Sequence, residues 1–179
     1  MRIIAGKAKG QVIKSPKGVS LRPTSDLIRG ALFSILESMA TDWSCVLDIY
    51  AGTGSLGLEA LSRGAVWADF VEQNPRCCAT IKENLARIGM TAQANVYNSS
   101  AIKAISFLTK KYDIVVMGPP YRESGVIETL EQLAISCLIG AGSTIAVEHS
   151  YRLPLSSTYG HMQLAKERRH GETCISVYQ

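Results

Sequence analysis

The chain has 179 residues, a length typical of one domain. Hydrophobic residues make up 46% of it and charged residues 19%, a composition that is typical of globular proteins and argues against disorder. No apolar run reaches the roughly 18 residues that span a bilayer. The first residues also lack the apolar core of a signal peptide. We therefore expect a single cytoplasmic domain over residues 1–179, monomeric and without a membrane partner. No cysteine or histidine spacing predicts a metal site.

The net charge of +4 is distributed unevenly. Residues 1–29 hold seven basic groups and one acidic group, whereas the remaining residues hold 12 basic and 14 acidic groups. A basic segment beside a nearly neutral body favours a polyanionic partner, although a solvated basic surface would give the same composition.

The basic segment predicts a hairpin followed by a helix. Residues 3–5 and 11–13 are short apolar runs around two glycines, which indicates two strands and a turn. A loop over 15–23 follows. Thr24 or Ser25 can cap a helix whose apolar residues recur at helical spacing as far as Met39.

From residue 44 onward, predicted strands alternate with predicted helices. We expect strands at 46–49, 67–71, 94–97, 112–117 and 143–147, and helices at 56–62, from Pro75 to about Ile88, 101–108 and 126–138. Two antiparallel strands at 162–165 and 174–177 complete the chain. This alternation predicts an α/β, Rossmann-like fold with a mostly parallel sheet covered on both faces. The change in composition separates a hairpin and helix at 1–43 from a core at 44–179.

The loop after the first core strand has the spacing of a nucleotide-binding turn. Gly52, Gly54 and Gly57 form G-x-G-x-x-G between a strand and a helix, and Glu72 ends the next strand. This pattern alone fits either NAD or S-adenosylmethionine (SAM). A P-loop is excluded because no Gly-Lys-Ser/Thr follows, and a tight turn that binds nothing is disfavoured by the two acids.

Asp48, just before the loop, favours SAM over NAD. A carboxylate there would repel the pyrophosphate of NAD, whereas SAM carries an ammonium group and a cationic sulfur. Glu72 can accept hydrogen bonds from both ribose hydroxyls.

The segment Gly118-Pro119-Pro120-Tyr121 follows the strand predicted at 112–117. It lies at the edge of the sheet where an open parallel sheet binds its ligand. Two prolines remove backbone donors and leave carbonyls free to accept, and Tyr121 offers a ring on which a base can stack. These four candidate catalytic residues suit methylation of an exocyclic nucleobase amine; the alternative is a rigid loop with a core tyrosine.

The chain resembles the RsmD-type methyltransferases, which methylate guanine N2 in bacterial small-subunit ribosomal RNA. The resemblance spans the whole chain and is most specific in the N-terminal part, where it rests on residues 2–7, Lys9-Gly10 and Arg22-Pro23-Thr24-Ser25-Asp26. Further matches are the glycine loop at 48–54, residues 57–65, Phe70-Val71-Glu72, residues 112–115 with the Pro-Pro-Tyr loop, and Gly171-Glu172-Thr173.

The resemblance implies a seven-stranded class I methyltransferase fold with an antiparallel C-terminal hairpin. It also implies SAM as methyl donor and ribosomal RNA, or a small-subunit assembly particle, as partner. The expected cofactor-binding residues are Asp48, Tyr50, Ala51, Gly52, Thr53, Gly54, Leu56, Glu72, Gln73, Asn74, Ser99, Ser100 and Ala101. The expected RNA contacts are Arg2, Lys7, Lys9, Lys14, Lys17, Arg22 and Thr24.

Two positions depart from the family's pattern. Gly118 stands where the family has Asp or Asn to accept from the target amine, and Ser100 stands where it has Asp to accept from adenine. If the acceptor missing at Gly118 behaves like one lost oxyanion-hole donor, the reaction slows on the order of 10²–10³-fold. A serine hydroxyl at residue 100 can still accept from adenine, more weakly than a carboxylate.

Several hypotheses therefore stay open. The enzyme could be slow, or could use another carboxylate such as Glu123 or Glu148. The chain could bind SAM and RNA with weak or no catalysis, or act as a non-catalytic assembly factor. An adenine-N6 methyltransferase and an NAD-linked reductase are the remaining alternatives.

Overall fold

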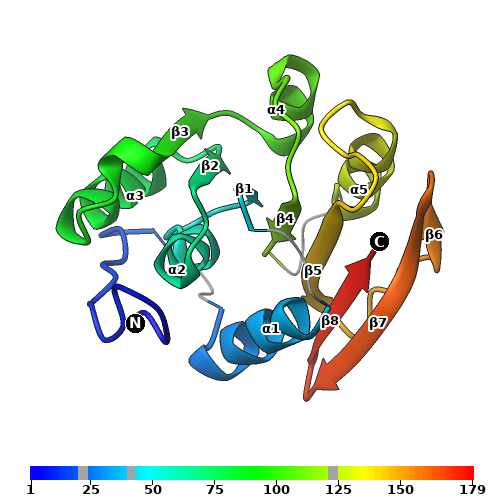
Figure 1. The fold of residues 1–179 in the computed structure, drawn as a ribbon, viewed down its shortest axis with the longest axis horizontal. Helices are drawn as coiled ribbons and strands as arrows, with labels where there is room; N and C mark the ends of the chain where they lie inside the picture. Colours follow the sequence, from blue (N-terminus) through cyan, green and yellow to red (C-terminus); the bar gives the residue numbers. More distant parts are fainter. Residues whose placement is uncertain (20–23, 40–42, 121–124) are drawn as a thin grey trace.

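The computed structural model describes residues 1–19, 24–39, 43–120 and 125–179. Its centre is a sheet with the order β3-β2-β1-β4-β5-β8-β7-β6 (Figure 1). The first five strands in that order pair in parallel, and β8, β7 and β6 are added antiparallel. The strands are β1 Cys45–Ile49, β2 Trp67–Glu72, β3 Ala94–Asn98, β4 Ile114–Met117, β5 Thr144–Ser150, β6 Thr158–Tyr159, β7 Met162–His170 and β8 Thr173–Tyr178.

Helices cover both faces of this sheet, which confirms the predicted fold class. Alternate strand residues feed two separate hydrophobic clusters, one shared with α1, α2 and α3 and the other with α4 and α5. Val46 of β1, for example, belongs to the first cluster and its neighbour Leu47 to the second. The helices are α1 Asp26–Ser38, α2 Ser55–Arg63, α3 Pro75–Arg87, α4 Ala101–Phe107 and α5 Val126–Ile135, with a 3₁₀ turn at Thr91–Gln93.

The structure adds detail that the sequence pattern did not give. β6 is a two-residue strand that pairs with Met162 and Gln163, so the sheet has one more strand than expected. β5 continues past the expected end at residue 147 to Ser150, which places Glu148 inside the strand. Within the described ranges, no helix combines the length and apolar character needed to cross a membrane.

The N-terminal segment is a closed loop where two strands were expected. A single bridge joins Arg2 to Val12, supported by backbone hydrogen bonds such as Ile3 N to Gln11 O at 3.0 Å. The next two amides, of Ile4 and Ala5, instead donate to the Glu59 carboxylate of α2 at 2.8 and 3.0 Å. Because these donors are used by the body of the protein, they do not extend a strand ladder.

Glu59 is fully buried and is the point where the N-terminal segment, α1 and α2 meet. One carboxylate oxygen lies 2.8 Å from Arg63 Nε, and the other lies 3.5 Å from Nε of the buried Arg29 in α1. Arg29 also donates to the backbone carbonyl of Arg2. A buried charge is stable only when it is paired and hydrogen-bonded, and Glu59 meets both conditions.

We expect Glu59→Gln to lower the free energy of unfolding by about 3–5 kcal/mol, because it removes the buried negative charge that Arg29 and Arg63 share and leaves each arginine with an exposed carboxylate alone. Chemical denaturation measures the change. Glu37→Gln is the matched control, since Glu37 pairs with the same Arg63 at 2.6 Å but its side chain is 52% exposed. That control should cost less than about 1 kcal/mol; equal losses in the two variants would contradict the role given to Glu59.

Candidate functional site

The predicted cofactor residues come together at the carboxyl edge of the parallel strands. The loops after β1, β2 and β3 leave neighbouring strands at this edge, and the segment after β4 leaves it on the other side of β1. The strand order reverses between β1 and β4, which is the switch point where sheets of this kind bind ligands. Residues separated by up to 70 positions in the sequence therefore share one site.

The glycine loop after β1 has a backbone that ordinary residues rarely adopt. Gly52 and Gly54 have φ values of 55° and 77°, and Tyr50 is the one non-glycine with positive φ among the described residues. A side chain at Gly57, in the first turn of α2, would clash with the ring of Phe70. The glycines thus serve both the turn and the close packing of α2 on β2.

Asp48 lies directly beneath this loop, 1% exposed. Its Oδ2 accepts from the backbone N–H of Gly57 at 2.8 Å, while Oδ1 has no hydrogen-bond partner among the described residues. Burial raises the pKa of Asp48 to about 7; the Glu72 charge adds to this, and the Gly57 hydrogen bond opposes it. Asp48 therefore holds an unused acceptor that a cationic ligand would satisfy.

Glu72 ends β2 with its carboxylate fixed at the mouth of the loop. Oε2 accepts from Gly52 N at 2.8 Å, and Oε1 accepts from Asn74 N at 2.7 Å. Each oxygen keeps a lone pair, so the pair can still accept from two hydroxyls of a sugar. Asn74 in turn caps α3 by accepting from Arg76 N, and the carbonyl of Gln73 accepts from Asn98.

The hydroxyls of the two serines after β3 differ in whether a hydrogen bond within the protein already uses them. Ser99 Oγ is buried without a hydrogen-bond partner in the described part of the chain, and Ser99 N donates to the carbonyl of Glu72. Ser100 Oγ caps α4 by accepting from Lys103 N at 3.4 Å, and Ala101 begins that helix. The hydroxyl best placed to meet a ligand is therefore that of Ser99, whereas the sequence pattern pointed to Ser100.

Gly118 leaves β4 beside two polar side chains. A Cβ built on Gly118 would lie 3.7 Å from Thr24 Oγ1 and 3.9 Å from Glu148 Oε2, both ordinary contact distances. Thr24 Oγ1 and Glu148 Oε2 are themselves 2.5 Å apart. Pro119 is buried and Pro120 exposed, while Tyr121, like Glu123 and the predicted RNA contact Arg22, lies outside the described residues.

The predicted RNA contacts follow a strip along α2 and α3. Lys7 N donates to the carbonyl of Ser62, near the end of α2 that is farthest from the glycine loop. Arg2 and Lys9 belong to the same closed loop. Lys14 pairs with Glu83 of α3 at 3.0 Å, and Lys17 is exposed. Thr24 alone among the described members of this set contacts a side chain beside Gly118.

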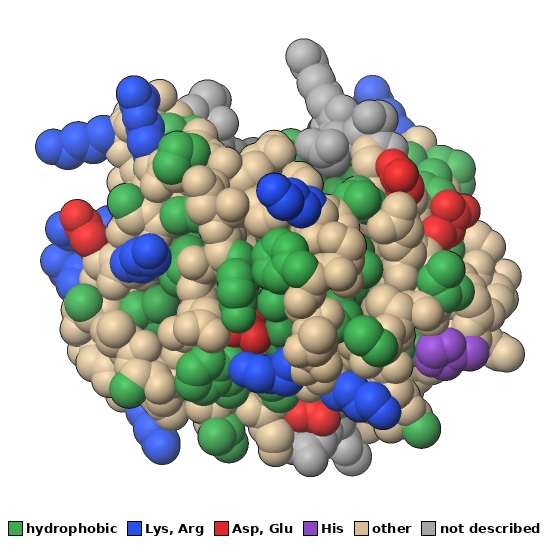
Figure 2. Space-filling view, turned by 90° about the horizontal axis from the view of Figure 1, so that it is seen from above, with side chains coloured by type: hydrophobic (Ala, Val, Ile, Leu, Met, Phe, Trp, Pro, Cys, Tyr) green, Lys and Arg blue, Asp and Glu red, His purple; other side chains and the backbone are tan. Residues whose placement is uncertain are grey.

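A second basic group at the carboxyl edge was missed from the sequence. Tyr151 directly follows β5, and the guanidinium carbons of Arg169 and Arg152 lie 4.0 and 5.4 Å from its ring centre. Arg152 also pairs with Glu172. The basic run at 166–170 was the available signal, but its approach to Tyr151 depends on pairing between strands. Figure 2 shows one face of the molecule, on which Lys and Arg side chains are scattered among hydrophobic and other residues.

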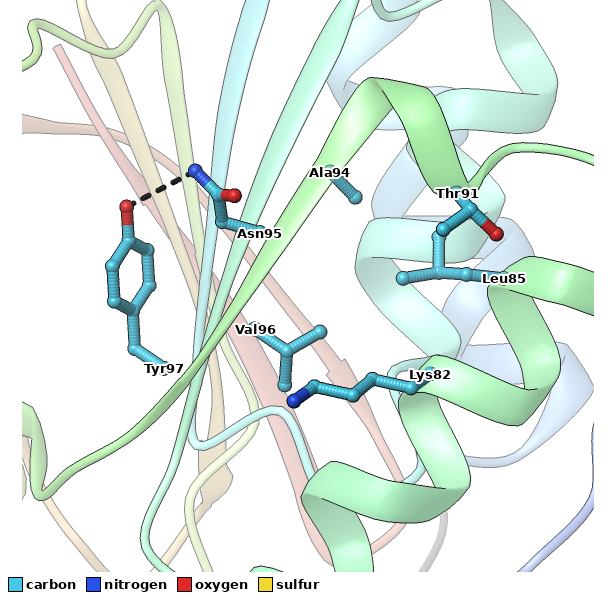
Figure 3. Close-up of a pocket in the computed structure, with 7 residues that line it drawn as sticks. All are labelled: Lys82, Leu85, Thr91, Ala94, Asn95, Val96 and Tyr97. Atoms are coloured by element: carbon cyan, nitrogen blue, oxygen red, sulfur yellow. Dashed lines mark hydrogen bonds between the residues drawn. The ribbon is translucent and has the colours of Figure 1, made fainter.

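A cavity of about 420 Å³ lies apart from these residues, between α3 and the edge strand β3 (Figure 3). It is lined by Lys82, Leu85, Thr91, Ala94, Asn95, Val96 and Tyr97. Asn95 donates to the Tyr97 hydroxyl at 3.2 Å. None of the residues with an unused buried acceptor lines it, so the carboxyl edge is the better candidate site. The described ranges also contain no group of three metal-ligating side chains.

Sheet order, glycine loop and the acid that ends β2 together define a class I methyltransferase. The model of the family described as "Conserved hypothetical protein 95", which is the RsmD-type family, matches residues 1–179. The chain therefore belongs to that family. The resemblance found in the sequence is thereby confirmed.

Similar proteins carry methyltransferase names. "Putative rRNA methyltransferase YlbH" of Bacillus subtilis is 30% identical, with 100% of this chain and 98% of that protein covered. "Ribosomal RNA small subunit methyltransferase D" of Escherichia coli is 34% identical, with 100% and 89% covered. The solved structure titled "Putative methyltransferase yhhF from Escherichia coli" is 32% identical, covers 100% of this chain and 97% of its own, and superposes with a TM-score of 0.87.

The raised pKa of Asp48 has a consequence for stability. Because the folded state holds this proton more tightly than the unfolded chain, the charged form costs stability, increasingly so from about pH 4 to pH 7. We expect Asp48→Asn to raise the unfolding free energy of the unliganded protein by about 1–4 kcal/mol above pH 7, with the gain vanishing near pH 4. Chemical denaturation at the two pH values tests this; a pH-independent effect would contradict it.

Proposed function

We propose that this protein transfers a methyl group from SAM to the exocyclic N2 amine of a guanine in small-subunit ribosomal RNA. The observation that carries the proposal is the unpaired, buried Oδ1 of Asp48 beneath a glycine loop whose neighbour across the sheet is the Gly118-Pro119-Pro120 segment. The names of the most similar relatives support ribosomal RNA as the substrate.

The residues at the edge fit the parts of SAM one by one. Asp48 offers an anionic acceptor for the cationic amino-acid end, Glu72 offers two oxygens to the ribose hydroxyls, and Ser99 offers its hydroxyl to the adenine. When bound, SAM supplies an electrophilic methyl group. The protein has only to position the amine and stabilise its developing charge.

The target base has to leave its stack to reach this edge. Pro119 and Pro120 contribute no backbone donors, so their carbonyls stay available to the N–H groups of the incoming amine. Such acceptors turn the nitrogen lone pair toward the methyl group. Expected stacking by Tyr121 would hold the base in place.

RNA contact along the basic strip would bring the substrate to this edge. Lys14 and Lys17 lie on the part of the N-terminal segment that runs toward the glycine loop, and Arg152 and Arg169 lie on the opposite flank. Phosphate contacts of this kind supply much of the affinity for RNA and are weakened by salt.

Asp48→Asn is expected to weaken SAM binding on the order of 10-fold or more, since a buried charge pair is lost. The wild type should also bind SAM more weakly as the pH falls below about 7, where Asp48 takes up a proton. Isothermal titration calorimetry measures both effects. The same substitution should stabilise the unliganded protein, so opposite signs in the two experiments separate a binding role from misfolding; stronger stabilisation by NAD than by SAM would refute the assignment.

Methyl transfer is tested with labelled SAM on protein-free small-subunit RNA and on small-subunit particles. We expect label in N2-methylguanosine after digestion to nucleosides and mass analysis. Label in N6-methyladenosine would favour the adenine alternative. Salt-dependent RNA binding with SAM bound but no label on either substrate would indicate a non-catalytic binding protein.

A further inference from the structure

Gly118 and Glu148 are neighbours across two parallel strands. The last residue pair between β4 and β5 is Met117 with Val147. The residues that follow each of them, Gly118 and Glu148, therefore lie side by side. Glu148 is 7% exposed and lies on the side of β5 that faces Thr24, at the start of α1. The buried carboxylate of Glu148 thus lies beside residue 118, where this chain lacks the acceptor side chain of the family.

The distances show that Glu148 approaches the space a side chain at 118 would enter. Its Oε2 lies 3.9 Å from a Cβ built on Gly118, and the nearest other atom is Leu56 Cδ1 at 3.5 Å. Because residue 118 is glycine, it places no side chain between the carboxylate and the backbone of the segment that follows β4. The φ of Gly118 is not in the left-handed region, so its backbone does not itself demand glycine.

Thr24 gives the carboxylate a defined orientation. Its Oγ1 lies 2.5 Å from Glu148 Oε2, and a threonine hydroxyl is the donor when it meets a carboxylate. The two oxygens of a carboxylate together offer about four lone-pair sites, so one carboxylate can accept from several donors at once. The arrangement is that of a positioned acceptor, with Thr24 as the positioning residue.

We propose that the Glu148 carboxylate accepts the target amine's N–H and so replaces the acceptor that residue 118 lacks. The inference rests on the proposed methyl transfer. The amine gives its lone pair to the methyl carbon as the methyl–sulfur bond breaks and leaves its electron pair on sulfur. The positive charge that forms on nitrogen is relieved when one N–H proton passes to Glu148, from which it leaves to solvent.

The test moves the carboxylate from one strand to the other. Glu148→Gln keeps the size of the side chain and an oxygen for Thr24, but removes the charge. We expect kcat for methyl transfer to fall on the order of 10²-fold, with the KM for RNA and the SAM-induced thermal shift unchanged. Adding Gly118→Asp to this variant should raise kcat at least about tenfold above that of Glu148→Gln, because a Cβ at residue 118 lies at ordinary van der Waals distance from its neighbours and directs the new carboxylate from the same place in the fold.

Further measurements distinguish a chemical role from a structural one. Because Asp48 also takes up a proton as the pH falls, kcat is measured with SAM saturating at every pH. A fall in kcat at low pH that the wild type shows and Glu148→Gln lacks would indicate a chemical role for Glu148. Glu131→Gln, an exposed carboxylate on α5, is the control and should leave every parameter unchanged.

Two results would overturn the inference while leaving the proposed function intact: full activity in Glu148→Gln, or a loss that Gly118→Asp does not restore. Failure of the proposed function is recognised separately. In that case the wild type and the single variant Gly118→Asp both bind SAM but produce no methylated nucleoside, and the inference falls with it.

Discussion

The Glu59 carboxylate is the interaction on which the geometry of the whole molecule depends. Its helix, α2, begins at the glycine loop, so any movement of α2 moves the cofactor site. Through Ile4 and Ala5 the same carboxylate holds the basic N-terminal segment, and through Arg29 it holds α1. Because α1 begins beside Thr24, the acceptor at Glu148 is tied to the same network. One buried charge therefore connects the basic N-terminal segment, the glycine loop and the edge where Gly118 and Glu148 meet.

Glu59 and Asp48, two of the buried carboxylates on the α1–α3 side of the sheet, differ in how far their charges are compensated. Glu59 has ionic partners and backbone donors on both oxygens. Asp48 has one backbone donor and a pKa raised to about 7. Incompletely compensated buried charges are frequent at functional sites, and here the oxygen without a partner coincides with the switch point of the sheet. The instability is local and lies where a cation is expected to bind.

Local sequence patterns predicted most of the residues that the structure brings together at the carboxyl edge of the sheet. Asp48, the glycines and Glu72 belong to short strand–turn units whose geometry follows from neighbouring residues. What the sequence did not reveal depends on contacts between distant segments, such as Arg29 with Glu59 or Tyr151 with Arg169. The preference for Ser99 over Ser100 depends on which hydroxyl the start of α4 uses as its cap. Glu148 was considered only as one of several carboxylates, and only the register of β4 with β5 places it beside Gly118.

The docking of the N-terminal segment has a consequence for how the chain folds during synthesis. The amides of Ile4 and Ala5 are separated from Glu59 by 55 and 54 residues, and Ala8 is equally far from Ser62. Since chains are made from the N-terminus, at roughly 5–20 residues per second, this segment emerges seconds before the helix that receives it. During that interval its lysines and arginines are exposed beside the ribosome, itself a polyanion. Glu59 holds the segment by its backbone amides and leaves those basic side chains available, so docking on α2 completes the fold without neutralising them.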